Sequence, residues 1–211
     1  MIKKVAKLIM AGVLASPLAA MGADAAEQLR QFVQGVQAAT GEFTQSMLTE
    51  AGQPGAGGQQ GTFSFKRPGK FKWLVEQPYQ QLTLSDGKQL YQYDPDLAQV
   101  IVRSVDDSVG ASPAAILFGS GDLDESFRLS SLPQADGLEW LRAEPRSPDA
   151  GFVHVDIGFH EGNPTRLLLL DSFGQTSRID LGNMVTNPSL APNEFTFTPP
   201  ADADVVHMQG Q

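Results

Sequence analysis

The stretch that decides the fold is residues 62–93, TFSFKRPGKFKWLVEQPYQQLTLSDGKQLYQY. Apolar side chains alternate with polar ones along it, beginning with Phe63 and Phe65, and this is the period of a β-strand. Turn signals separate the alternating runs, namely Pro68-Gly69, Pro78 and the strong hairpin signal Asp86-Gly87. The stretch therefore predicts consecutive antiparallel strands joined by short turns.

The same spacing of strands and turns continues on both sides of this stretch. The further strands that we expect toward the C-terminus are 100–105, 127–129, 138–143, 152–159, 166–170, 177–185 and 195–197. On the N-terminal side, Phe43 to Met47 alternates in the same way, and the glycine-rich loop 51–61 follows it. About ten strands in succession predict a curved antiparallel sheet or barrel, because a sheet of that size must curl.

Two helical patterns interrupt the strands. Four apolar residues fall at i, i+3, i+4 and i+7, namely Leu29, Phe32, Val33 and Val36. They predict a helix over 27–40, capped by Asp24 and ended by Gly41. An apolar run with Pro113 at its first helical position predicts a second, short helix over 113–119. We expect an α+β, mainly β, fold: an incomplete curved antiparallel β-barrel with a helical cover over its concave apolar face.

Residues 1–23 have the pattern of a secretory signal peptide. Three lysines precede the short apolar run 8–14, and small residues follow up to Ala23. An amphipathic N-terminal anchor is the alternative, although the run has no polar face and is too short to cross a bilayer. We expect cleavage after Ala23, or slightly later in Ala23-Asp24-Ala25, and a single domain over 24–211.

The composition excludes several classes of function. The chain has no cysteine, which rules out a disulfide framework, a zinc–thiolate site, a cysteine nucleophile and a lipid anchor on cysteine. Residues 1–23 hold three of the 15 lysines and arginines and none of the 24 acids, so 24–211 carries a net charge of −12. Such a chain is a poor nucleic-acid binder and is repelled by an anionic membrane. Its ligand is therefore expected to be neutral, cationic or apolar.

No catalytic or metal-binding motif stands out among the polar residues. The three histidines lack partners at the spacing of a metal or nucleophile motif. Asp122, Asp124 and Glu125 lack the glycine and the terminal glutamate of a calcium loop, and no Gly-x-Ser-x-Gly occurs. We expect no cofactor, no metal and no enzymatic activity.

A series of short motifs runs through the chain in a fixed order. They are Phe43-Thr44-Gln45, Lys66-Arg67-Pro68, Phe71-x-Trp73, Pro78, Ser85-Asp86-Gly87-Lys88, Tyr93-x-Pro95 and the ending Phe195-Thr196-Phe197-Thr198-Pro199-Pro200. Together they resemble the periplasmic outer-membrane lipoprotein carrier family, LolA, although 121–190 carries little family signal. The resemblance implies an incomplete β-barrel closed by helices. It also implies a carrier that takes triacylated lipoproteins from an inner-membrane ABC transporter to an outer-membrane receptor.

The resemblance assigns roles to two residues. In the family, the arginine at the position of Arg67 reaches from the sheet to backbone carbonyls of the cover and latches it closed. A guanidinium suits this role because it offers five donors to helix-end carbonyls that lack partners; a rim salt bridge is the alternative. Phe71 matches the family position at the cavity mouth, where the carrier meets its membrane partners. An ordinary packing role is the alternative for Phe71.

An apolar cavity for acyl chains is expected between the sheet and its cover. One-face alternation on the strands and the apolar character of the second helix select its lining. The residues selected are Met47, Phe71, Trp73, Leu84, Ile116 and Leu117. An error of one residue in register would turn a strand's contribution to the opposite face.

The lack of cysteine separates this chain from the family's receptor partner, LolB, which has a similar fold but is anchored through a cysteine. We therefore expect a shuttling periplasmic carrier, monomeric, that binds no nucleic acid. Its partners would be acylated lipoproteins as cargo, the releasing ABC transporter and a LolB-like outer-membrane receptor. Two alternatives stay open. One is a generic periplasmic lipid or glycolipid binder, and the other is an envelope-stress sensor of the same fold, which usually carries a second domain.

Overall fold

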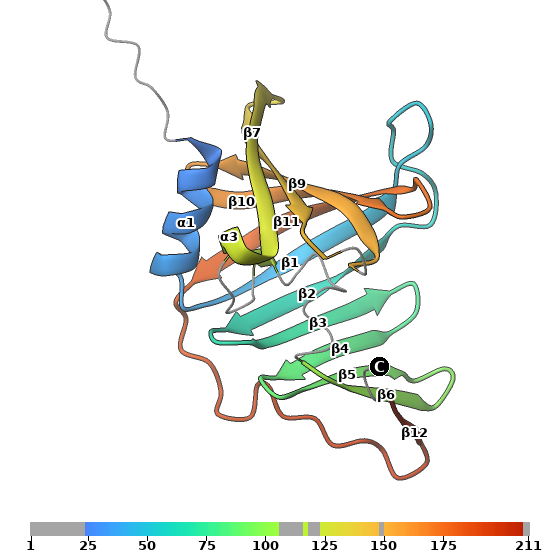
Figure 1. Cartoon of the computed structure of the whole chain (residues 1–211). Helices are drawn as coiled ribbons and strands as arrows, with labels where there is room; N and C mark the ends of the chain where they lie inside the picture. Colours follow the sequence, from blue (N-terminus) through green and yellow to red (C-terminus); the bar gives the residue numbers. More distant parts are fainter. Residues whose placement is uncertain (1–23, 106–115, 118–122, 148–149, 209–211) are drawn as a thin grey trace, which may run out of the picture.

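The computed structural model describes residues 24–105, 116–117, 123–147 and 150–208. The predicted signal peptide and most of the predicted helix 113–119 lie outside these residues. Within them, one sheet of 12 strands curls into an open, trough-like half-barrel (Figure 1). The predicted fold class, mainly β with a curved sheet, is confirmed.

Most strands are joined by short turns, and the longer connections lie between β1 and β2, between β6 and β7 and between β11 and β12. They are β1 (Ala38–Met47), β2 (Gln59–Lys66), β3 (Lys70–Gln77), β4 (Gln81–Asp86), β5 (Gln89–Asp94), β6 (Gln99–Ser104), β7 (Phe127–Ala135), β8 (Leu138–Pro145), β9 (Phe152–His160), β10 (Asn163–Asp171), β11 (Thr176–Thr186) and β12 (Asp204–His207). Their order in the sheet is β12-β6-β5-β4-β3-β2-β1-β11-β10-β9-β8-β7. The pairing of β1 with β11 therefore joins the two halves of the chain.

Two details of the sheet differ from the sequence prediction. The expected strand over 195–197 is wrong, because these residues form a turn and irregular chain. The sheet gains β12 instead, which pairs with β6 in the parallel direction, whereas the other neighbours are antiparallel.

Helix α1 (Ala25–Gly35) is shorter than predicted. It begins at the expected N-cap, Asp24, but the Asp24 side chain makes no capping hydrogen bond. Val36 is already extended (φ −103°, ψ 101°), and β1 begins at Ala38. Gly41 is not a helix stop. It lies within β1, where an added Cβ would come within 2.6 Å of the Phe63 ring.

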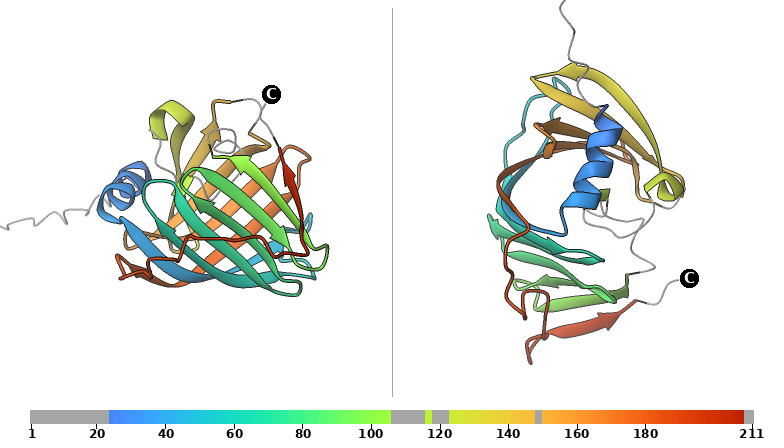
Figure 2. Two further views of the ribbon diagram at one scale, coloured as in Figure 1. Left: turned by 90° about the horizontal axis from the view of Figure 1, so that it is seen from below. Right: turned by 90° about the vertical axis from the view of Figure 1, so that its left-hand side faces the viewer.

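The hydrophobic core lies on the concave face of the sheet. Helix α1 rests inside the curve (Figure 2, right), with Leu29 and Phe32 fully buried and the Phe32 ring 6.3 Å from that of Phe65. Ile116 and Leu117 are helical and belong to the same buried cluster. A short helix, α3 (Leu123–Ser126), precedes β7. Among the described residues, no helix has the length and apolar character needed to span a membrane.

The convex face of β2–β6 is covered by the C-terminal segment 187–203, which runs across it toward β12 (Figure 2, left). The ring of Phe197 packs 5.5 Å from Tyr91 and 5.6 Å from Tyr93. Glu194 accepts a hydrogen bond from Ser64 at 2.9 Å and pairs with Lys72 at 3.4 Å. This segment thus gives the convex side a second, smaller buried layer.

Charged pairs line the outer face of β8–β11. Arg142 donates twice to Asp156, at 2.7 and 2.8 Å. Arg166 and Arg178 both donate to Asp180, at 2.6 and 2.7 Å. Burial alone would raise the pKa of Asp180, but these hydrogen bonds outweigh it and lower the pKa. The Arg142–Asp156 and Arg166–Asp180 pairs join neighbouring strands on the side that faces away from the core, whereas Arg178 and Asp180 both belong to β11.

Candidate functional site

The register of β1–β3 gathers aromatic side chains on the concave face. Residues that pair directly across antiparallel strands share a face; Phe65 pairs with Phe71, and Phe63 pairs with Trp73. The ring of Trp73 stacks on Phe43 with centroids 3.7 Å apart. These five aromatic residues form one continuous apolar wall beneath α1.

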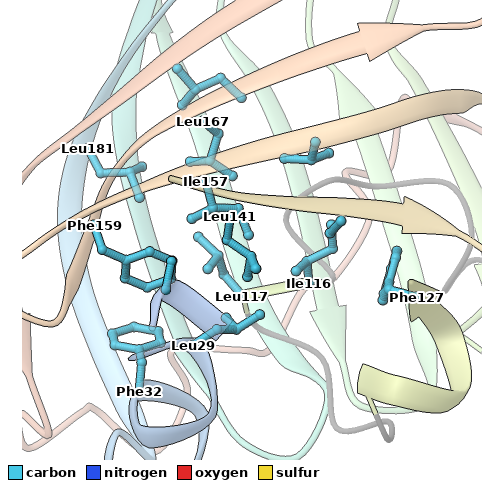
Figure 3. Close-up of a cluster of buried hydrophobic side chains, with 14 of the residues drawn as sticks. Leu29, Phe32, Ile116, Leu117, Phe127, Leu141, Ile157, Phe159, Leu167 and Leu181 are labelled. Carbon is cyan, nitrogen blue, oxygen red and sulfur yellow. The ribbon is translucent and has the colours of Figure 1, made fainter. Parts of the chain in front are cut away.

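The other half of the concave face is equally apolar. Strands β7–β11 contribute aliphatic and aromatic side chains that meet the cover, as Figure 3 shows. These residues are Phe127, Leu141, Ala143, Val155, Ile157, Phe159, Leu167, Ile179 and Leu181. They form a single cluster with Leu29, Phe32, Ile116 and Leu117. The concave face of β1–β3 and β7–β11 and its cover are therefore one apolar surface, the type of surface that binds hydrocarbon.

Four of the six predicted lining residues lie at this surface. Ile116 and Leu117 are each 1% exposed within the cluster, and Phe71 and Trp73 pack against it. Met47 is on the same face at the far end of β1, but it is 43% exposed, with its Sδ 3.1 Å from the Ser177 hydroxyl. The part of these residues in binding a ligand stays a prediction.

The prediction for Leu84 is wrong, because it lies on the convex face. Ser85 pairs with Phe71, and Leu84 pairs with Lys72 and Tyr91. Leu84 is 2% exposed because the convex layer buries it, outside the concave cluster. The alternation predicts the strand correctly, but the residue expected on the concave face is off by one, because Ser85 lies there.

The predicted lining lacked several large apolar residues that the N-terminal half contributes to the cluster. They include Leu29 and Phe32 of α1 and Phe43, Phe63, Phe65 and Val75 of the concave sheet face. Their signal was present in the sequence, as the apolar stripe of α1 and the alternation of β1 and β2. Sequence alone did not show that these elements face one another.

Arg67 joins the sheet to both parts of the cover. Its Nε donates to the carbonyl of Val36, directly after α1, at 2.9 Å. Its Nη2 donates to the carbonyl of Leu117 at 2.5 Å. The guanidinium also lies 5.0 Å from the centre of the Phe65 ring, within cation–π range. One side chain therefore holds two segments that are far apart in the sequence.

Burial lowers the pKa of Arg67 to about 10. The guanidinium is still protonated at neutral pH, so its hydrogen bonds to the two carbonyls are charge-assisted. Without Arg67, the carbonyls of Val36 and Leu117 would lose a donor. This geometry suits a latch, and the latch role itself stays a prediction.

The polar features of the described residues suggest neither a metal centre nor a second apolar site. In these parts of the chain, no group of three His, Cys, Asp or Glu residues is placed to hold a metal ion. A hollow of about 440 Å³ lies on the convex side of β1, β2 and β11, but Glu42, Glu76 and Asp180 are in its lining. Carboxylates make it unsuited to hydrocarbon.

A known protein family matches most of the chain. The profile of the family described as "Outer membrane lipoprotein carrier protein LolA" matches residues 34–198. The chain belongs to the LolA family. The match covers β1 to β11 and residues 187–198 of the C-terminal segment that crosses the convex face.

Three relatives of this LolA-family chain that match over most of their length carry the same name. An "Outer-membrane lipoprotein carrier protein" of Bordetella avium is 57% identical, over 92% of this chain and 92% of its own length. The protein of that name from Bordetella pertussis is 55% identical, over 94% and 93%. That from Cupriavidus necator is 47% identical, over 87% and 88%.

Solved structures show the same fold at low sequence identity. An uncharacterized conserved protein from Thermus thermophilus aligns with a TM-score of 0.54 and 14% identity, covering 88% of this chain and 100% of that one. A LolA superfamily protein from Nitrosomonas europaea aligns with a TM-score of 0.50 and 13% identity, covering 81% and 95%. The open half-barrel is thus shared well beyond the close relatives.

Proposed function

We propose that this LolA-family protein is a non-enzymatic carrier that moves lipoproteins across the periplasm to the outer membrane. The acyl chains of the cargo lie between the concave sheet face and the cover formed by α1 and the Ile116–Leu117 segment. The observation that carries the proposal is the single apolar cluster shared by sheet and cover. The names of relatives that match over most of both chains support it.

Closure of the cover on the sheet regulates the affinity of the carrier for its acylated cargo. Each buried methylene contributes about 0.8 kcal/mol, so one acyl chain of about 15 methylenes contributes roughly 12 kcal/mol. A permanently open apolar face would hold several chains too tightly for release, and when empty it would aggregate. A cover that packs on the sheet in the empty protein removes both problems, because opening it subtracts from the affinity for cargo.

Arg67 is the latch of the closed cover. Its hydrogen bonds to Val36 and Leu117 stabilise the state in which both cover segments contact the sheet. Cargo separates cover and sheet, so these bonds break in the loaded protein. The latch thus favours release, and the acceptor needs less affinity to take the lipoprotein.

Residues 1–23 direct the chain through the inner membrane and are then removed, which places residues 24–211 in the periplasm. An inner-membrane ABC transporter loads the carrier, and a LolB-like receptor on the outer membrane unloads it. Both contact the cavity mouth, where Phe71 is half-buried against the core cluster. The carrier acts as a monomer.

A pull-down with purified lipoproteins tests the proposal. The mature protein is incubated with one lipoprotein in its acylated form and with the same protein lacking acyl chains. We expect retention of the acylated form alone. Equal retention of both forms would contradict acyl-chain binding. Retention of free phospholipid or glycolipid in preference to lipoprotein would instead favour a generic lipid binder.

A further inference from the structure

The concave face is not apolar throughout. Strands β4–β6 continue it beyond Phe71 with residues of a different character. Phe71 pairs with Ser85, Ser85 with Leu90, and Leu90 with Arg103, so these four residues lie in one row across the concave face. The neighbouring row contains Thr83, Gln92 and Ile101 on the same face. The trough is therefore amphipathic, apolar over β1–β3 and β7–β11 and largely polar over β4–β6.

Arg103 differs from the other arginines of the described chain. Seven of the eight arginines in these residues have a carboxylate or carbonyl partner: Arg30, Arg67, Arg128, Arg142, Arg146, Arg166 and Arg178. Within the same residues, the Arg103 side chain has none, and its Nε is buried without a hydrogen-bond partner. A buried N–H without an acceptor is unfavourable, and such groups are rare in native proteins.

Arg103 lies on the same face of the sheet as the apolar wall. It lies three strands from Phe71, about 14 Å along the sheet at roughly 4.8 Å per strand. Leu90, which is 7% exposed, lies beside it. An amphipathic ligand in the trough can thus place its hydrocarbon against β1–β3 while its polar end reaches β4–β6.

We propose that Arg103 binds the carbonyl oxygens that join the acyl chains to the polar end of the cargo, an inference that rests on the proposed carrier function. Ester and amide carbonyls are hydrogen-bond acceptors, and a guanidinium offers donors only, in a planar fork. Arg103 therefore orients the cargo, with its chains toward the apolar cluster and its linkage groups toward β4–β6. It is a specificity residue that distinguishes acyl esters from plain hydrocarbon.

A pair of synthetic lipopeptides tests this assignment. One carries two ester-linked chains, and the other carries ether-linked chains of equal length, which lack the carbonyls. Their affinities are measured for wild type, Arg103→Leu and Arg103→Lys, with Arg128→Leu as the matched control. Arg128 is 71% exposed and on the opposite face, so its substitution changes the net charge equally without touching the trough.

We expect Arg103→Leu to lower the affinity for the ester lipopeptide about tenfold and to leave the affinity for the ether lipopeptide within about twofold. The affinity of Arg103→Lys for the ester lipopeptide should lie between those of wild type and Arg103→Leu, and the affinity of Arg128→Leu should equal that of wild type. The melting temperature of empty Arg103→Leu should not fall, because the Arg103 Nε has no hydrogen-bond partner within the described chain.

Two results would overturn the assignment. Equal loss of affinity for both lipopeptides, together with a lower melting temperature, would show a structural role for Arg103. Unchanged affinity of Arg103→Leu for the ester lipopeptide would show no role in binding. If wild type bound neither lipopeptide, the carrier proposal itself would fail, and the inference with it.

Discussion

Replacing Arg67 by leucine should impair release of cargo while leaving loading intact. The substitution removes two charge-assisted hydrogen bonds, to Val36 at 2.9 Å and to Leu117 at 2.5 Å. Carbonyls that lose their donor in a partly buried site cost about 1–3 kcal/mol. In the proposed latch mechanism the loaded, open protein does not make these bonds, so the whole cost applies to the empty, closed state. The equilibrium should therefore shift toward cargo-bound carrier by roughly 5- to 150-fold.

A reconstituted transfer assay measures this shift. Carrier loaded with a labelled lipoprotein is mixed with acceptor receptor, and the rate of appearance on the receptor is followed for wild type, Arg67→Leu and Arg67→Lys. Leucine should slow transfer strongly, and lysine should be intermediate because an ammonium lacks the planar fork. Arg128→Leu, whose arginine is 71% exposed, is the control and should transfer normally. Transfer by Arg67→Leu at the wild-type rate would refute the latch.

Three further outcomes are expected. Arg142→Leu leaves Asp156, which is 8% exposed, without its bidentate partner. Chemical denaturation should therefore show that the free energy of unfolding falls by about 3–5 kcal/mol, against less than about 1 kcal/mol for Arg128→Leu. Equal losses in the two variants would contradict this prediction. Burial lowers the pKa of His154, so the contribution of the neutral imidazole to the free energy of unfolding is full above the unfolded pKa of about 6.5 and is lost as pH falls below that value. His154→Gln should therefore reduce the loss of stability between pH 7.5 and 5.5. An unchanged pH dependence of stability in this variant would contradict the prediction. Phe71→Glu should weaken crosslinking to the membrane partners more than it weakens binding of a soluble lipopeptide, and the reverse order would place Phe71 in the cavity rather than at its mouth.

The strands were predictable because their signals are local. The turns in 62–93 predicted β2–β5 to within a few residues, since proline, glycine and Asp-Gly restrict the backbone wherever they occur. Which face of each strand lies on the concave side was harder to predict. Alternation shows that two faces differ but not which one is concave, and Leu84 is as apolar and as buried as the concave residues.

The failures occurred where a distant segment decides the local structure. Gly41 has the sequence pattern of a helix stop, whereas the Phe63 ring on the neighbouring strand occupies the space of its missing side chain. The C-terminal segment and β12 were missed because they are held by Tyr91, Tyr93 and β6, far away in the sequence. Arg67 was found only through the family resemblance, since no pattern in the sequence names its carbonyl partners.

Photo-crosslinking tests the central claim, that acyl chains lie between the concave face and its cover. A lipoprotein with a photoreactive group at the end of an acyl chain is loaded onto the carrier, illuminated and mapped by mass spectrometry. We predict adducts on concave residues such as Phe43, Trp73 and Leu141 and on the cover at Leu29. Adducts confined to the convex layer around Leu84 and Phe197, or to exposed hairpins, would contradict the account.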